Sequence, residues 1–459
     1  MTFDPQIAAI RLGYGLSPLT APPATAGDLL DSVRLAGMDQ DPMRMRRVRR
    51  VQDRLVKLNA RMKNAQGAEK ADTRDRKRAY QRKIRDLERQ LVQRRIARAV
   101  GDPAGFGERL VQFWSDHFTV SGGGLQQMLM AASLVDEAIR PHLSGRFADM
   151  MFAAETHPRM LTYLDQARSF GPNSTIARRQ QNRELGLNEN LAREMIELHS
   201  LGVAGDYTQT DVRQLAKLLT GLTYNARKDQ SFRPGMAEPG AETVLGRSYG
   251  GDGPARLADI RAVIDDLAGH EDTASHLARK LAVHFVSDDP PAGLIGRLAA
   301  VYRETDGDLG MLSAALAEAP EVAAHFRAKM RQPFDFLVAA LRGLGFDRDA
   351  VMALPLREAH ARLINPLKGM GQDWGRPRGP DGWPEAAESW VTPQGLATRI
   401  DWAMRHPAKL VATLPDPRSF LISTLGDTAS DALRWAVPKA ESAREGLAII
   451  LASSDFNRR

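Results

Sequence analysis

Cysteine is absent from the 459-residue sequence. Disulfide bonds, thiolate metal sites and a thiol nucleophile are therefore excluded, and any catalytic group must carry oxygen or nitrogen. No run of 18 apolar residues occurs, and the start of the sequence lacks the basic and apolar segments of an export signal. We therefore expect a soluble protein that is cytoplasmic by default, with non-classical export left open.

Common nucleotide-binding and nucleophile motifs are also missing. The sequence has neither a G-x-x-x-x-G-K-S/T loop nor a G-x-G-x-x-G run after a predicted strand, so nothing supports nucleotide binding. The G-x-S-x-G motif of serine hydrolases does not occur either.

Charge is distributed very unevenly along the chain. The formal net charge is +7, but residues 43–100 alone hold 21 Lys and Arg against 6 Asp and Glu, a net of +15. The rest of the chain therefore carries −8, and the high isoelectric point belongs to one segment. With 43% hydrophobic residues, the chain as a whole is able to bury a globular core.

The basic segment has a helical pattern with a break near residues 64–67. Apolar residues recur at helical spacing on both sides of that break, at Val48, Val51, Leu55, Leu58, Ile84, Leu87, Leu91 and Ile96. A narrow apolar stripe with charged outer faces predicts a protruding antiparallel helical hairpin of the coiled-coil type.

The basic hairpin has three interpretations. It is a solvated arm, a contact surface for a protein partner, or a phosphate-binding face of a nucleic-acid-binding protein. Tyr80 is its only aromatic residue, and no base-reading module is recognisable. Nucleic acid is therefore the least favoured partner. The oligomeric state is not predicted.

The predicted fold class is all-α: one large multi-helix domain with the basic hairpin and a small irregular β-hairpin or loop. Within this single domain of residues 1–459, we distinguish the hairpin at 43–100, a helical core at 101–229, the irregular loop at 230–254 and a C-terminal helical part at 255–459. Gly and Pro are frequent in the loop, where residues 242–245 form a candidate strand.

The most polar predicted helix pair lies in residues 188–224, NENLAREMIELHSLGVAGDYTQTDVRQLAKLLTGLTY. At 100° per residue, Asn190, Glu194 and Glu197 share one face with Arg193 at its edge. His199 falls on the opposite face, which is not the geometry of two helical metal ligands spaced i and i+4.

Structural explanations exist for most of these polar residues. Arg193 and Glu197 are spaced for an i, i+4 ion pair, and Asn188 is a candidate N-cap. Thr208 and Asp211 fit a capping box at the start of the second helix. His284 lies in an apolar helical stretch and is expected to be a core histidine.

Several motifs together resemble one family signature. The runs NENLAREMIELHSLG, YTQTDV and LTG, with FWSDHF further upstream, are similar to the conserved runs of the bacterial family known as domain of unknown function 1800. Similar segments extend over nearly the whole chain outside the basic hairpin. The resemblance implies a family but no activity.

The density of polar groups in these motifs suggests a site. We expect a hydrolase-like catalytic or divalent-cation pocket at the candidate residues Asp165, Asn190, Glu194, Glu197 and His117. Carboxylate and amide oxygens suit hard cations such as Mg²⁺, Ca²⁺ or Mn²⁺. The alternative is a non-enzymatic scaffold or assembly protein whose signature forms a buried polar network that fixes helix register.

Overall fold

The computed structural model describes residues 3–38, 41–122, 124, 126–180, 185–225, 230–377 and 379–459. Over these residues the chain is mostly helical, and its strands pair into two small antiparallel sheets of two strands each. The predicted all-α class is therefore confirmed. In this described part of the chain, every helix is too short or too polar to cross a membrane.

The chain opens with α1 (Pro5–Arg11) and α2 (Ala26–Gly37). The first helix ends at Arg11, two residues before Gly13. A side chain at position 13 would place its Cβ 2.1 Å from the carbonyl oxygen of Ala104, so the backbone there approaches its neighbour as only glycine permits.

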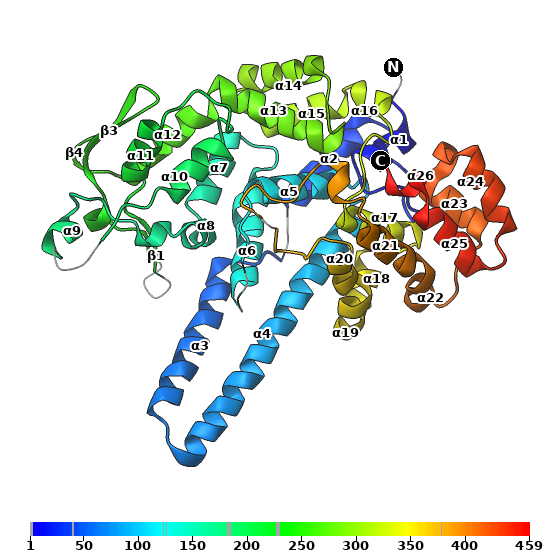
Figure 1. Ribbon diagram of the computed structural model, residues 1–459, viewed down its shortest axis with the longest axis horizontal. Helices are drawn as coiled ribbons and strands as arrows, with labels where there is room; N and C mark the ends of the chain where they lie inside the picture. Colours follow the sequence, from blue (N-terminus) through cyan, green and yellow to red (C-terminus); the bar gives the residue numbers. More distant parts are fainter. Residues whose placement is uncertain are drawn as a thin grey trace.

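The basic segment forms the predicted hairpin. Helices α3 (Met45–Asn64) and α4 (Gly67–Gly101) lie side by side and project from the body (Figure 1). Gly67 has φ +51°, a left-handed value that suits the reversal between the two helices. Towards its C-terminal end α4 enters the body, where Leu91, Ile96 and Val100 are buried.

After the hairpin, the chain builds one lobe of the molecule (Figure 1). The elements up to the strands are α5 (Phe106–His117), α6 (Gln127–Leu134), the π-helical turn η1 (Val135–Ile139), η2 (Arg140–His142), α7 (Phe147–Glu155), α8 (Pro158–Tyr163), η3 (Gln166–Arg168), α9 (Thr175–Arg179), α10 (Asn190–Glu197) and α11 (Gln209–Leu218). The helices after the strands are α12 (Leu257–Ala268), α13 (Glu271–Phe285), α14 (Ala292–Glu304), α15 (Leu309–Ala317) and α16 (Glu321–Ala324).

The strands lie in residues 230–254, which the sequence marks as irregular, and just before them. β1 (Leu222–Asn225) pairs with β2 (Gln230–Phe232), and η4 (Pro234–Met236) leads to the longer hairpin of β3 (Pro239–Val244) and β4 (Arg247–Pro254). The predicted strand at residues 242–245 lies mostly within β3. The first pair of strands is a feature that the sequence did not indicate.

The second lobe contains the C-terminal helices. They are α17 (Pro333–Gly343), α18 (Arg348–Ala353), α19 (Leu356–Ala359), η5 (His360–Ile364), α20 (Asn365–Gly369), η6 (Ala387–Ser389), α21 (Pro393–Arg405), α22 (Pro407–Leu410), α23 (Pro417–Leu425), η7 (Gly426–Thr428), α24 (Asp431–Ala436), η8 (Val437–Lys439), α25 (Ala443–Ala452) and α26 (Ser454–Asn457). Each lobe has its own large hydrophobic cluster, and the end of α4 belongs to the second one.

Helix α5 runs through the centre of the first cluster. Its side chains are buried on nearly every face, as expected of a helix surrounded by others, and they include the carboxylate Glu108. Arg95 of α4 and Arg140 of η2 form ion pairs with Glu108, at 3.1 and 2.6 Å. These contacts tie the root of the hairpin to the central helix, whose C-terminal end carries Asp116 and His117.

Candidate functional site

The signature helix is shorter than its sequence pattern suggests. Asn188 Oδ1 accepts a hydrogen bond from the backbone N–H of Asn190 at 2.8 Å and so caps the start of α10. The helix ends at Glu197, and the backbone of His199 donates to the carbonyl of Glu194 over a wider turn, at 3.0 Å. His199 therefore lies beyond the regular helix, where the helical wheel no longer sets its direction.

The outward stripe of α10 makes surface contacts. Arg193 forms an ion pair with Glu197 at 3.1 Å and donates a hydrogen bond to Gln209, also at 3.1 Å. Asn190 is exposed. The ion pair that the sequence predicts as the structural explanation is thus present.

The two remaining carboxylates of the predicted set are Asp165 and Glu194. Asp165 is exposed and adopts φ +55° between α8 and η3. Glu194 is half-buried, and burial raises the pKa of its carboxyl group although nearby His199 acts in the opposite direction. Thr208 and Asp211 form the predicted capping box of α11.

His199 points into the protein instead of towards the stripe. It is 2% exposed, and its Nδ1 lies 2.6 Å from Oε1 of Glu155, a carboxylate at the end of α7 that is fully buried. Since a carboxylate accepts, Nδ1 donates in this pair. The carboxylate thereby fixes the orientation of the imidazole, as carboxylate partners of histidines commonly do.

His117 is the one predicted site residue that lies at a cleft. Its Nε2 is 3.2 Å from the carbonyl oxygen of His199, and because a carbonyl only accepts, Nε2 carries the proton. Nδ1 therefore has a free lone pair, to which Lys280 Nζ donates at 3.1 Å. Burial and the adjacent charge of Lys280 lower the pKa of His117 well below its usual value, so the ring is neutral.

One face of α13 supplies further titratable groups. His276, Lys280 and His284 follow one another at intervals of four residues. His276 Nε2 donates to the carbonyl of Leu198 at 3.2 Å, and burial, together with Lys280, lowers the pKa of His276 to about 4. A Cβ at Gly202 would lie 2.7 Å from His276 Nδ1, so glycine after the signature leaves room for this ring.

A cleft of ≈ 270 Å³ opens where the end of α5, this face of α13 and the loop of residues 379–386 meet. Its titratable lining consists of Asp116, His117, His276, Lys280, Asp381 and Glu385, with Arg279 at the edge. The groups come from segments more than 100 residues apart in the chain. The cleft is the place where the fold concentrates ionisable side chains beside solvent-accessible space.

The loop of residues 379–386 is held against α5 by Asp116. The backbone N–H of Trp383 lies 3.1 and 3.0 Å from the two carboxylate oxygens of Asp116 and donates to them. Gly382 adopts φ +86°, and a Cβ there would lie 2.6 Å from the Asp116 carboxylate. Glycine at position 382 therefore permits both the turn and the close approach of the carboxylate.

Asp116 and Lys280 have pKa values that are shifted towards each other. Burial raises the pKa of Asp116 to about 8, and neighbouring Glu385 adds to the rise. Burial lowers the pKa of Lys280, although Asp116 and Glu385 both favour its charged form. A carboxyl group with a raised pKa and an amine with a lowered pKa, lining the same cleft, are suited to acid–base chemistry.

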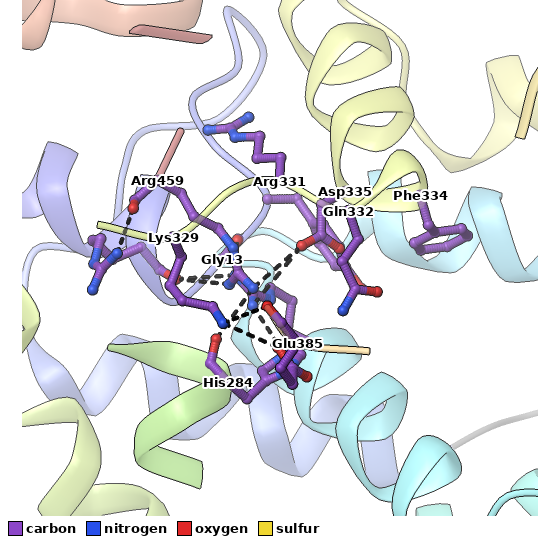
Figure 2. A network of polar contacts seen from close by, with 12 residues as sticks. Gly13, His284, Lys329, Arg331, Gln332, Phe334, Asp335, Glu385 and Arg459 are labelled. Carbon is purple, nitrogen blue, oxygen red and sulfur yellow. Dashed lines mark hydrogen bonds and ion pairs between the residues drawn. The ribbon is translucent and has the colours of Figure 1, made fainter. Parts of the chain in front are cut away.

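Glu385 is held by a network that extends into the protein interior (Figure 2). His284 Nδ1 donates to Glu385 Oε1 at 2.6 Å, while Arg109 donates to His284 Nε2 at 3.0 Å. The buried Lys329 lies 3.3 Å from Glu385 Oε2. Burial raises the pKa of Glu385, but His284 and Lys329 outweigh this and lower it to about 2, so Glu385 is a permanent anion at the cleft.

Beyond Glu385 the network joins both ends of the chain to the centre. Asp335 of α17 lies 3.5 Å from Arg459 and 4.0 Å from Arg109. Figure 2 shows Asp335 and Arg459 in this network. Arg11 of α1 donates to the carbonyl oxygen of Arg459. The two lobes therefore meet at a set of buried charges that position the cleft wall.

The divalent cation suggested by the sequence has no fitting set of ligands in the described part of the chain. No group of three or more His, Asp or Glu side chains there is arranged to hold a metal ion. Both ring nitrogens of His117 already have hydrogen-bond partners, and Glu197 is paired with Arg193.

Sequence reasoning missed Asp116, Lys280 and Glu385. Asp116 lies within the FWSDHF motif, directly before His117. A usable signal existed in HLARKLAVH, residues 276–284, because spacing of i, i+4 and i+8 places its two histidines and Lys280 on one helical face. Glu385 follows the turn-forming PDGW run, but nothing local indicates what it faces.

Comparison with known families agrees with this arrangement of motifs. A family model described as "Protein of unknown function (DUF1800)" matches residues 7–458. The chain belongs to this family. Neither the curated proteins nor the solved structures contain a significant match to it. Family membership assigns no reaction, so the chemistry has to be argued from the cleft.

Proposed function

We propose that the cleft is a hydrolase-like catalytic pocket in which Asp116 and Lys280 form an acid–base pair. The observation that carries the proposal is the placement of Lys280 Nζ, 3.1 Å from His117 Nδ1, in a cleft that it shares with Asp116 and Glu385. The proposed site keeps His117 from the sequence-derived set. It replaces Asp165, Asn190, Glu194 and Glu197 with residues that the fold brings to a cavity.

Each group has a role set by its contacts. Uncharged Lys280 accepts a proton from an attacking water, and protonated Asp116 gives a proton to the leaving group of a polarised bond. His117 is a positioning residue, because its lone pair holds the amine of Lys280 in place. Glu385 stabilises the positive charge that forms on Lys280 when it takes up the proton.

The proposal is tested with chromogenic esters, amides, phosphate esters and glycosides as substrates. Wild-type protein is expected to hydrolyse at least one class. Lys280→Met and Asp116→Asn are expected to reduce kcat/KM by about 10²-fold or more, the usual contribution of a general acid or base. Glu197→Gln serves as the matched control and should stay within about twofold, because Glu197 contacts Arg193 on the surface. Hydrolysis that survives Lys280→Met would contradict the proposal.

The basic hairpin supports a separate proposal, contact with a partner protein. It exposes basic side chains on both helices, including Arg50, Lys57, Lys63, Lys70, Arg74 and Arg85. Such a surface fits an acidic protein better than it fits a base-reading role, since Tyr80 is its only aromatic side chain. A cytoplasmic location is part of this proposal. Salt-sensitive capture of an acidic protein that is lost after charge reversal at these positions would support it; unchanged capture would contradict it.

A further inference from the structure

A second cavity lies beside the catalytic cleft. It has a volume of ≈ 140 Å³ and is bounded by the root of α4, by α5 and α6, and by the loop after α20. Asp116 and Trp383 line both this cavity and the cleft. The cavity and the cleft therefore adjoin at the carboxyl group of Asp116, which is the proposed acid of the cleft.

The lining of the second cavity is mainly apolar. Its apolar wall includes Leu91, Val92, Met128, Leu134, Trp374 and Pro377. Ionisable residues make up a smaller share of this lining than of the cleft lining. A hydrophobic group gains free energy on entering such a space roughly in proportion to the apolar area that it buries.

The arginines at the edge of this cavity are neutralised. Arg94 lies 2.6 Å from Asp41, Arg95 lies 3.1 Å from Glu108, and Arg98 lies 3.1 Å from Asp136. Each guanidinium thus has a carboxylate partner within the protein. The cavity therefore favours an uncharged ligand group over an anionic one.

The size of the cavity limits what it can hold. An apolar cavity of about 150 Å³ in another protein accommodates one benzene ring. The ≈ 140 Å³ here is thus sufficient for a single aromatic ring or an alkyl group of similar bulk, and too small for a fused ring system. A ring bound here would place its substituent at Asp116, within the space shared with the cleft.

We propose that this second cavity is a specificity subsite that binds one uncharged aromatic ring, or an alkyl group of similar size, of the substrate. The statement that the bound molecule is a substrate rests on the proposed function. The statement that the cavity binds such a molecule does not depend on the chemistry of Lys280. The substrate class is accordingly a small amphiphile with one apolar group next to the hydrolysed bond.

Benzyl alcohol is the probe, and its binding to the full-length chain is followed by saturation-transfer NMR. Saturable binding is expected for wild type, with methanol and 1-naphthalenemethanol at least tenfold weaker. Ala131→Leu places additional carbons in the cavity and is expected to weaken benzyl alcohol binding at least tenfold. Ala71→Leu, at an exposed position of α4, is the matched control and should leave binding unchanged.

A second measurement does not depend on whether Ala131→Leu folds. Met128 lies on the cavity wall, so its methyl resonance, assigned with Met128→Leu, should shift when wild type binds benzyl alcohol. Absence of saturable binding, an unmoved Met128 methyl group, or equal affinity in a folded Ala131→Leu variant would each overturn the subsite. Lys280→Met is expected to bind the probe within threefold of wild type, so the subsite and the acid–base pair fail independently.

Discussion

The two sides of the signature segment differ in what their polar residues do. On the outward side of α10, the side chains of Arg193 and Glu197 are 39% and 22% exposed and form an ion pair with each other. The side chain of His199, just beyond the end of the same helix, is 2% exposed. It is paired at 2.6 Å with Glu155 of α7, whose side chain is 0% exposed. The carbonyl of His199 in turn accepts from His117 at the cleft wall.

This difference shows that buried side chains brought together from separate segments indicate a site more reliably than a high density of polar residues in the sequence does. An exposed ion pair contributes only about 0.3–0.5 kcal/mol, because water screens it and two long side chains are immobilised. Breaking a buried pair costs several kcal/mol, because the remaining group stays uncompensated in the interior. The structure near the cleft therefore depends on the buried pair of His199 and Glu155, the inward pair.

Removal of the buried carboxylate should have the largest effect. Glu155→Ala leaves the Nδ1 proton of His199 without its acceptor and opens a space in the core. The free energy of unfolding is expected to fall by about 3–5 kcal/mol, measured by urea denaturation. A loss below about 1 kcal/mol would mean that the inward pair is no more important than the outward one.

Gly382→Ala should have the next largest effect. The added Cβ would lie 2.6 Å from the Asp116 carboxylate, and φ +86° is strained for alanine. Stability is expected to fall by about 1–3 kcal/mol, with a change in Trp383 fluorescence as the loop moves off Asp116. Gly371→Ala, at φ +101° with open space around its Cβ, separates backbone strain from the clash. Equal losses in the two variants would remove the argument for close packing on Asp116.

Asp116→Asn should change how stability depends on pH. The pKa of Asp116 is raised from 3.8 to about 8 in the folded protein, so its contribution is full below pH 3.8 and is lost as pH rises through about 8. Asparagine has no such dependence. Relative to wild type, the variant should therefore gain stability between pH 5 and pH 8, by about 1 kcal/mol per pH unit. Urea denaturation across this range measures the gain, and a difference that does not vary with pH would show that Asp116 is not shifted.

Glu197→Gln should have the smallest effect. It removes the exposed pair with Arg193 and is expected to cost about 0.5 kcal/mol or less, with the loss decreasing at high salt. The same denaturation experiment at low and high salt measures it. A cost above about 2 kcal/mol, independent of salt, would mean that the outward stripe is part of a buried network, as the scaffold hypothesis requires.

Local features of the fold were predictable from the sequence. The hairpin, the break between its helices and the capping box at Thr208 and Asp211 depend on short-range spacing and cap chemistry, and all three occur in the structure. The first pair of strands was not predicted. Pairing of β1 with β2 depends on contacts between strands and is weakly encoded in four-residue and three-residue segments.

The site was predictable only in part. His117 was identified, but its role depends on Lys280, which is 163 residues away in the chain. The helical wheel placed His199 opposite Glu194 and Glu197 on the assumption of a regular helix, whereas α10 ends at Glu197. Asp116 and Glu385 acquire their shifted pKa values from burial and from partners that only the tertiary structure brings near.

The protonation of Lys280 is the most direct test of the account. Trinitrobenzenesulfonate is reacted with wild-type protein at a series of pH values, and the modification of each lysine is followed by peptide mass spectrometry. We expect the midpoint for Lys280 to lie below 10.5 and below that of the exposed Lys70, and to fall further in Asp116→Asn, which removes a carboxylate that favours the charged form. A Lys280 midpoint at or above that of Lys70, unchanged in Asp116→Asn, would contradict the acid–base pair.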